Sequence, residues 1–226
     1  MTAATLDRPA AAALTPLSFD TATLRVQDLD LVTRYYADEL GFALLSKDQA
    51  GATLGTPDRP LLHLCADPSA RIAAAHQAGL FHLAWLLPSR LALARWALRA
   101  TANGLPMAAS DHIVSEALYL NDPEGNGIEI YADRAPETWD FSTGTVKMAT
   151  RRLDLRALAA SAEGECSPIP AGTVLGHVHL KVGEIAPAET FWTQALAMQV
   201  PARYGAPAVF LAGQHPSGGR YHPHTA

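Results

Sequence analysis

Apolar and polar residues follow each other in short blocks that predict strands, tight turns and a few helices. The clearest block covers residues 111–131. Within it, the apolar run 114–120 favours a strand, the stretch 121–127 is dense in Asn, Asp, Pro and Gly, and the apolar residues 128–131 follow. This pattern predicts a hairpin of two antiparallel strands joined by a tight turn.

The predicted hairpin carries three side chains that can do chemistry. Antiparallel pairing would place Tyr119 and Glu129 at neighbouring positions of the sheet, and His112 lies at the start of the first strand. An imidazole, a phenol and a carboxylate are unusual on a hairpin that is otherwise apolar. The hairpin is therefore the first candidate for a functional site.

A pattern of one strand followed by an amphipathic helix occurs three times along the chain. Residues 23–26 and 179–182 are two matching first strands, and each is followed by an acidic turn and a helical pattern. The third copy lies between them, with a strand at 82–87, Ser89 as the helix N-cap and a helix over 90–102 that ends at an Asn-Gly pair.

The middle copy continues with strands at 107–109, 113–120 and 128–131, so the repeating module is β-α-β-β-β. We therefore predict an α+β fold in which repeated βαβββ modules form curved mixed sheets. The predicted divisions are a flexible N-terminus at 1–16, module 1 at 17–70, module 2 at 79–134, a linker at 135–172 and an incomplete module 3 at 173–226.

Composition argues against several classes of function. The chain has 226 residues, of which 49% are hydrophobic and 17% charged, and its formal net charge is −5. It can bury a core, and without a basic run it is not expected to bind nucleic acid. Cys65 and Cys166 lack the spacing of a zinc site or a disulfide framework. We find no signal-peptide core and no membrane-spanning stretch, so we expect a cytoplasmic protein without a membrane partner.

The functional residues of the hairpin stand in a definite order. In chain order they are His112, Leu118-Tyr119, Asp122-Pro123, Gly125 and Glu129. This order resembles the signature of the type I extradiol dioxygenases of the vicinal-oxygen-chelate superfamily, and the wider segment resembles their two-domain, catechol-2,3-dioxygenase-like members. Ser110 departs from the small or β-branched residue that the family usually has two positions before the His.

The resemblance implies a metal centre of two imidazoles and one carboxylate, contributed by the first strands of two paired modules and by one last strand. Glu129 and His82 fill these positions in module 2, and His177 fills the first-strand position of module 3. If module 2 paired with module 1 instead, His63 could complete the site, because the matching Thr21 is a poor iron ligand. We favour the pairing of modules 2 and 3.

The chemistry that the resemblance implies is extradiol ring cleavage of a small aromatic diol by O2, with Fe(II), or alternatively Mn(II), as the cofactor. His112 would then move a proton and Tyr119 would hold the substrate oxygen as catalytic residues. His179 is expected to line the pocket. His222 and His224 lie near the place of a further family histidine, in a strand that departs from the family pattern.

Two alternatives to an active enzyme stay open. The family pattern includes a fourth module, which is absent here, so the chain could be a catalytically impaired fragment. It could also be a non-enzymatic small-molecule-binding protein of the same fold. A second chain could cover the unpaired module 1, which would make the protein a homo-oligomer.

Overall fold

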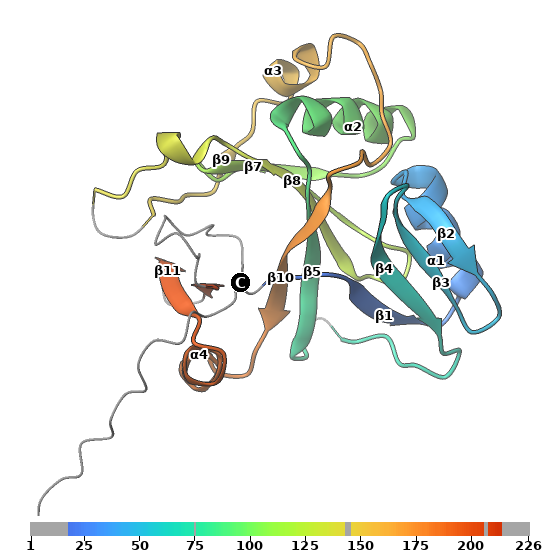
Figure 1. Cartoon of the computed structure of the whole chain (residues 1–226), viewed down its shortest axis with the longest axis horizontal. Coiled ribbons are helices and arrows are strands. Elements are labelled where there is room, and N and C mark those ends of the chain that lie inside the picture. Colours follow the sequence, from blue (N-terminus) through green and yellow to red (C-terminus); the bar gives the residue numbers. More distant parts are fainter. Residues whose placement is uncertain (1–17, 75, 143–145, 206–207, 214–226) are drawn as a thin grey trace, which may run out of the picture.

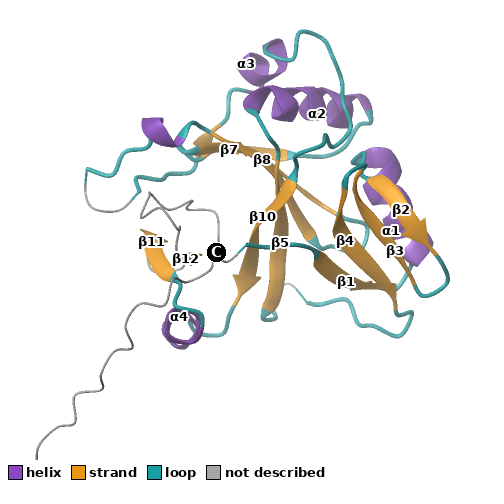
Figure 2. Cartoon of the chain, viewed as in Figure 1, coloured by secondary structure: helices purple, strands orange, loops and turns teal. Residues whose placement is uncertain are grey.

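The computed structural model describes residues 18–74, 76–142, 146–205 and 208–213. Their strands form a four-stranded and a six-stranded mixed sheet and a two-stranded antiparallel sheet (Figure 1). Helices lie at the periphery of the sheets (Figure 2). The predicted α+β class with curved mixed sheets is confirmed.

The first βαβββ unit, which we call the N-terminal unit, forms the four-stranded sheet. Its elements are β1 (Ala22–Val26), α1 (Leu29–Arg34), the π-helical turn η1 (Tyr35–Glu39), β2 (Ala43–Lys47), β3 (Gly51–Thr56) and β4 (Arg59–Ala66). The strand order is β1-β4-β3-β2, with β1 parallel to β4. The last strand therefore lies beside the first.

The second unit, which we call the central unit, repeats this order of elements. It consists of β5 (Gly79–Leu86), α2 (Arg90–Ala102), β6 (Ala108–Asp111), β7 (Ser115–Asn121) and β8 (Gly127–Asp133), with β5 parallel to β8. Two later strands extend its sheet, β10 (Val174–Lys181) beside β5 and β9 (Arg151–Arg152) beside β6. The resulting order is β10-β5-β8-β7-β6-β9.

The remaining elements are short and lie around this sheet. They are η2 (Pro136–Thr138), α3 (Leu155–Ala160), α4 (Ile185–Ala195), β11 (Gln199–Tyr204) and β12 (Ala208–Ala212). In Figure 1, α3 lies beside α2. In Figure 2, α4, β11 and β12 lie on the side of β10 that is away from β5. None of the helices in the described ranges is long and apolar enough to cross a membrane. The predicted N-terminus at 1–16, together with His222 and His224, falls outside those ranges.

Local sequence explains the bounds of α2. The Ser89 hydroxyl accepts a hydrogen bond from the Ala92 amide at 3.1 Å, which is the contact of an N-cap residue. Asn103 is the C-cap, and Gly104 follows with φ +71°. A glycine adopts this left-handed conformation without steric cost, so it ends the helix. The prediction of a helix over 90–102 is confirmed.

Strand alternation divides the central sheet into a core face and a polar face. Leu83, Trp85 and Ile130 lie on the core face and are at most 3% exposed, and Trp85 packs edge-on against Phe42 of the N-terminal unit. His82, in the wall of the cavity, and Ala84, in a separate small cluster with Ala117 and Tyr131, point to the opposite face. Because successive side chains of a strand point to opposite faces, one strand can build the core and a polar site at once.

A carboxylate in the hairpin turn joins the two units. The two Glu124 carboxylate oxygens accept hydrogen bonds from the Gln27 amide at 3.0 Å and from the Asp28 amide at 2.8 Å. Nearby, the Tyr35 hydroxyl donates to the Asn121 carbonyl at 2.9 Å. The turn between β7 and β8 is thereby fixed to the start of α1.

We expect Glu124→Gln to lower the free energy of unfolding by about 1 kcal/mol, because a neutral amide oxygen accepts backbone hydrogen bonds more weakly than a carboxylate. Urea denaturation of the two proteins measures this difference. An unchanged midpoint and slope would contradict a stabilising role for this contact.

Candidate metal centre

Three neighbouring strands bring three potential metal ligands to one face of the central sheet. His82 comes from β5, Glu129 from β8 and His177 from β10. In the strand register, Ala84 of β5 lies between Glu129 on one side and His177 on the other. The small alanine side chain leaves room for the larger side chains around it to converge.

The polar atoms of the three side chains lie within contact distance of one another. The Oε2 atom of Glu129 lies 2.9 Å from His82 Nε2 and 3.1 Å from His177 Nε2, and the two Nε2 atoms are 3.3 Å apart. The three residues are only 6%, 2% and 7% exposed in chain order. They form a group that could hold a metal ion, and two imidazoles with one carboxylate leave coordination positions open.

The electrostatics of the site keep the carboxylate ionised. Burial raises the pKa of Glu129, but the charge of His177, together with hydrogen bonds from His177 and His82, outweighs burial and holds the pKa well below its ordinary value. A metal binds the deprotonated carboxylate. Glu129 is therefore in the form that a cation requires.

His112 and Tyr119 form a hydrogen-bonded pair beside this group. His112 Nε2 lies 2.8 Å from the Tyr119 hydroxyl, and His112 Nδ1 lies 3.2 Å from the Ala149 carbonyl oxygen. A carbonyl can only accept, so Nδ1 carries the proton, and in the tautomer in which Nε2 carries none, Nε2 accepts from the phenol. The Tyr119 ring centre lies 5.7 Å from that of His82.

The tyrosine of this pair stays protonated. Burial foremost, and then the negative charge of Glu129, raise the pKa of Tyr119 above its ordinary value. A protonated phenol is a hydrogen-bond donor near neutral pH. Tyr119 is therefore able to donate either to His112 or to an anionic oxygen placed beside it.

A cavity of about 320 Å³ opens over the three potential ligands and the His112–Tyr119 pair. His179 lies in its wall, with its ring centre 4.8 Å from that of His82. Burial, together with the charges of His82 and His177, lowers the pKa of His179 to about 4, so its ring is neutral near pH 7.

Several residues of the cavity wall were not expected from the sequence. These are Phe81, Ser110, Met148, Ala149, Thr150, Tyr204, Ala208, Val209 and Phe210. Many of them come from the linker and from β11 and β12, where no motif marks them. A larger cavity of about 590 Å³ lies between β10, α4 and β12, contains none of the three potential ligands, and shares His179 with the smaller one. The three potential ligands therefore line the smaller cavity.

His63 lies in the other sheet, on β4, and is not part of the group. Its Nδ1 atom lies 3.0 Å from the Thr53 hydroxyl. It is β10, the strand of His177, that pairs with β5. The structure therefore does not support the alternative in which His63 completes the site.

Comparisons with known proteins identify the family of this chain. The model of the Glyoxalase/Bleomycin resistance protein/Dioxygenase superfamily matches residues 18–130. The catechol-2,3-dioxygenase of Bacillus subtilis (strain 168) is 38% identical to the chain over 209 residues, which cover 90% of this chain and 71% of that protein. The chain belongs to this superfamily, and a relative with a dioxygenase name covers most of its length.

Solved structures of similar proteins cover about half of the chain. A glyoxalase/dioxygenase from Nostoc punctiforme is 22% identical, with a TM-score of 0.44, and the match covers 56% of this chain and 99% of that one. A glyoxylase/bleomycin resistance protein/dioxygenase domain from Frankia sp. EAN1pec is 19% identical, with a TM-score of 0.46, and the match covers 54% and 96%.

Proposed function

We propose that the chain is a metal-dependent extradiol dioxygenase, which opens the ring of a catechol-type diol next to its two hydroxyl groups with O2. The observation that carries this proposal is the convergence of His82, Glu129 and His177 beside the pair formed by His112 and Tyr119. The 38% identity to a protein named catechol-2,3-dioxygenase supports the same reaction.

The residues present fit Fe(II), with Mn(II) as the alternative. His82, His177 and Glu129 would hold the ion with two imidazole nitrogens and one carboxylate oxygen, the donor set of non-haem Fe(II) oxygenases. When bound, the ion would supply Lewis acidity toward the diol and open positions for the diol and O2. A site with a fourth protein ligand would leave less room for two small molecules.

The remaining residues of the cavity would bind and orient the diol. The protonated Tyr119 hydroxyl would donate a hydrogen bond to a substrate oxygen, while His112 Nε2 would accept a proton during the reaction and return it. Phe81 and Phe210 provide apolar wall for an aromatic ring. At about 320 Å³, the cavity lies at the small end of the range for ligand sites, which suits a single-ring substrate.

The reaction can be tested directly. We expect protein loaded anaerobically with Fe(II) to form a yellow ring-opened product when catechol and air are added. His177→Ala should lose both iron uptake and product formation, whereas the matched variant His63→Ala, in the other sheet, should keep both. Iron uptake without product would favour a catalytically impaired protein, and no uptake would favour a non-enzymatic small-molecule-binding protein.

A further inference from the structure

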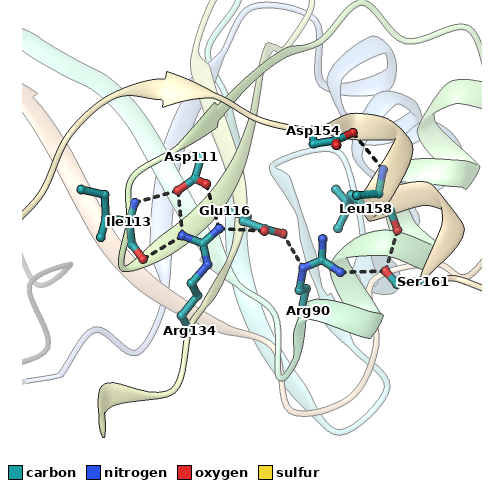
Figure 3. Close-up of polar contacts among 9 residues, drawn as sticks. Arg90, Asp111, Ile113, Glu116, Arg134, Asp154, Leu158 and Ser161 are labelled. Carbon is teal, nitrogen blue, oxygen red and sulfur yellow. Dashed lines mark hydrogen bonds and ion pairs between the residues drawn. The ribbon is translucent and has the colours of Figure 1, made fainter. Parts of the chain in front are cut away.

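A network of charged groups connects the ends of β6, β7 and β8 with α2 and the end of α3 (Figure 3). Arg134 Nη1 and Nη2 donate to the two carboxylate oxygens of Asp111 at 2.7 Å and 2.9 Å, and Nη2 also donates to Glu116 at 2.9 Å. The other oxygen of Glu116 accepts from Arg90 Nε at 2.8 Å, and Arg90 donates to the Ser161 hydroxyl at 3.0 Å. Two carboxylates thus fix the Arg134 guanidinium in one orientation.

The same arginine holds the backbone of Ile113. Arg134 Nη1 donates to the Ile113 carbonyl at 2.8 Å, and the Ile113 amide donates to Asp111 Oδ1 at 2.8 Å. Both backbone polar groups of Ile113 are therefore bound by the Asp111–Arg134 pair. Ile113 has φ +74°, a left-handed conformation that a β-branched residue strongly disfavours. Surrounding contacts must hold such a residue in place.

Ile113 directly follows His112, so its backbone conformation determines where the imidazole points. The His112 amide donates to the Ser115 carbonyl at 2.9 Å, and its ring reaches Tyr119 at 2.8 Å. If Ile113 relaxed to an ordinary negative φ, the peptide between the two residues would turn and the ring would leave Tyr119. Arg134 is not in the wall of the cavity, so it acts on the site indirectly, and this loop is the path that leads to His112.

We propose that Arg134 is a positioning residue: together with Asp111 it holds Ile113 in the left-handed conformation and thereby keeps His112 directed at Tyr119 and the metal-binding group. As far as turnover is concerned, this inference depends on the proposed dioxygenase function. Lysine cannot replace Arg134 here, because a single ammonium group cannot serve two carboxylates and a carbonyl in this fixed geometry.

The test is the variant Arg134→Lys, with Asp111→Asn as a milder second variant in case the first does not fold. We expect kcat to fall about tenfold or more, with little change in iron affinity or in KM. Adding Ile113→Gly to either variant should restore most of kcat, because glycine adopts φ +74° without support. Arg95→Lys, which changes an ion pair between α2 and Glu165, serves as the control and should leave kcat unchanged.

A second readout does not require turnover. Nitrogen NMR of the metal-free protein reports the His112 tautomer and its hydrogen bond to Tyr119. We expect this signal to change in Arg134→Lys and to return when Ile113→Gly is added. A variant that loses only thermal stability, with His112 signals and kcat as in the wild type, would overturn the inference, as would failure of the glycine to rescue. If the wild type shows no ring cleavage, the proposed function fails, but this NMR comparison still decides the role of Arg134.

Discussion

Replacement of Glu129 by glutamine is expected to lower the affinity for Fe(II) by more than about a hundredfold. The loss of a residue that only supports a ligand costs up to about a hundredfold, and Glu129 would itself be a ligand. Glutamine keeps the shape of the side chain and an acceptor oxygen, but it removes the only carboxylate of the three-residue group. The remaining imidazoles would then face a divalent ion without a neutralising negative charge. Anaerobic titration with Fe(II), followed by calorimetry, measures the change.

The matched control for this prediction is Glu124→Gln in the same hairpin. Glu124 contacts the backbone of Gln27 and Asp28 and lies outside the metal-binding group. We expect it to lose some stability while its iron affinity stays that of the wild type. Retention of stoichiometric, tight iron binding by Glu129→Gln would remove the proposed centre.

Replacement of Gly176 by alanine is expected to destabilise the protein by about 1–3 kcal/mol, the usual cost of overpacking. A methyl group at this position would lie 2.1 Å from the Tyr131 hydroxyl oxygen and 2.9 Å from Leu86 Cβ. Gly176 lies at an irregularity of β10 directly before His177, so any backbone shift would also move a potential ligand. We expect a lower melting temperature and an iron affinity reduced by about tenfold.

The double variant Gly176→Ala with Tyr131→Phe tests whether the contact with the Tyr131 hydroxyl causes the loss of stability. Removing the hydroxyl eliminates the closest of these contacts, so part of the lost melting temperature and iron affinity should return. If the double variant is as impaired as the single one, the clash with the tyrosine is not the reason that glycine is needed.

Much of the central unit could be predicted because its signals are local. The N-cap serine and the Asn-Gly end define α2, and the turn residues between β7 and β8 place Tyr119 opposite Glu129. The match between the repeats also predicts the register of His63 correctly. His63 of β4 lies between Thr23 and Thr53 on the neighbouring strands. Glu129 of β8 occupies the equivalent position, between Ala84 and Tyr119. The register alone, however, does not show whether His63 or His177 lies in the same sheet as His82 and Glu129.

The parts that could not be predicted depend on contacts between distant segments. Ala149, which holds the His112 ring, belongs to an irregular stretch without periodic pattern, and β9 pairs with β6 through only two residue pairs. The Arg134 network joins carboxylates 18 and 23 residues earlier in the chain. No helical or strand period relates such positions, so only the folded chain reveals that they meet.

The origin of the three ligands has a thermodynamic consequence. His82 and Glu129 belong to one unit, whereas His177 lies on β10, which is one of the two edge strands of that sheet among the described residues. A cation bound by all three residues would therefore link the central unit to the later part of the chain. By mass action, a free cation concentration of a hundred times the dissociation constant would stabilise the form in which β10 is paired with β5 by about 2.7 kcal/mol. The concentration of the metal would then determine how often β10 separates from β5, in addition to whether the proposed reaction takes place.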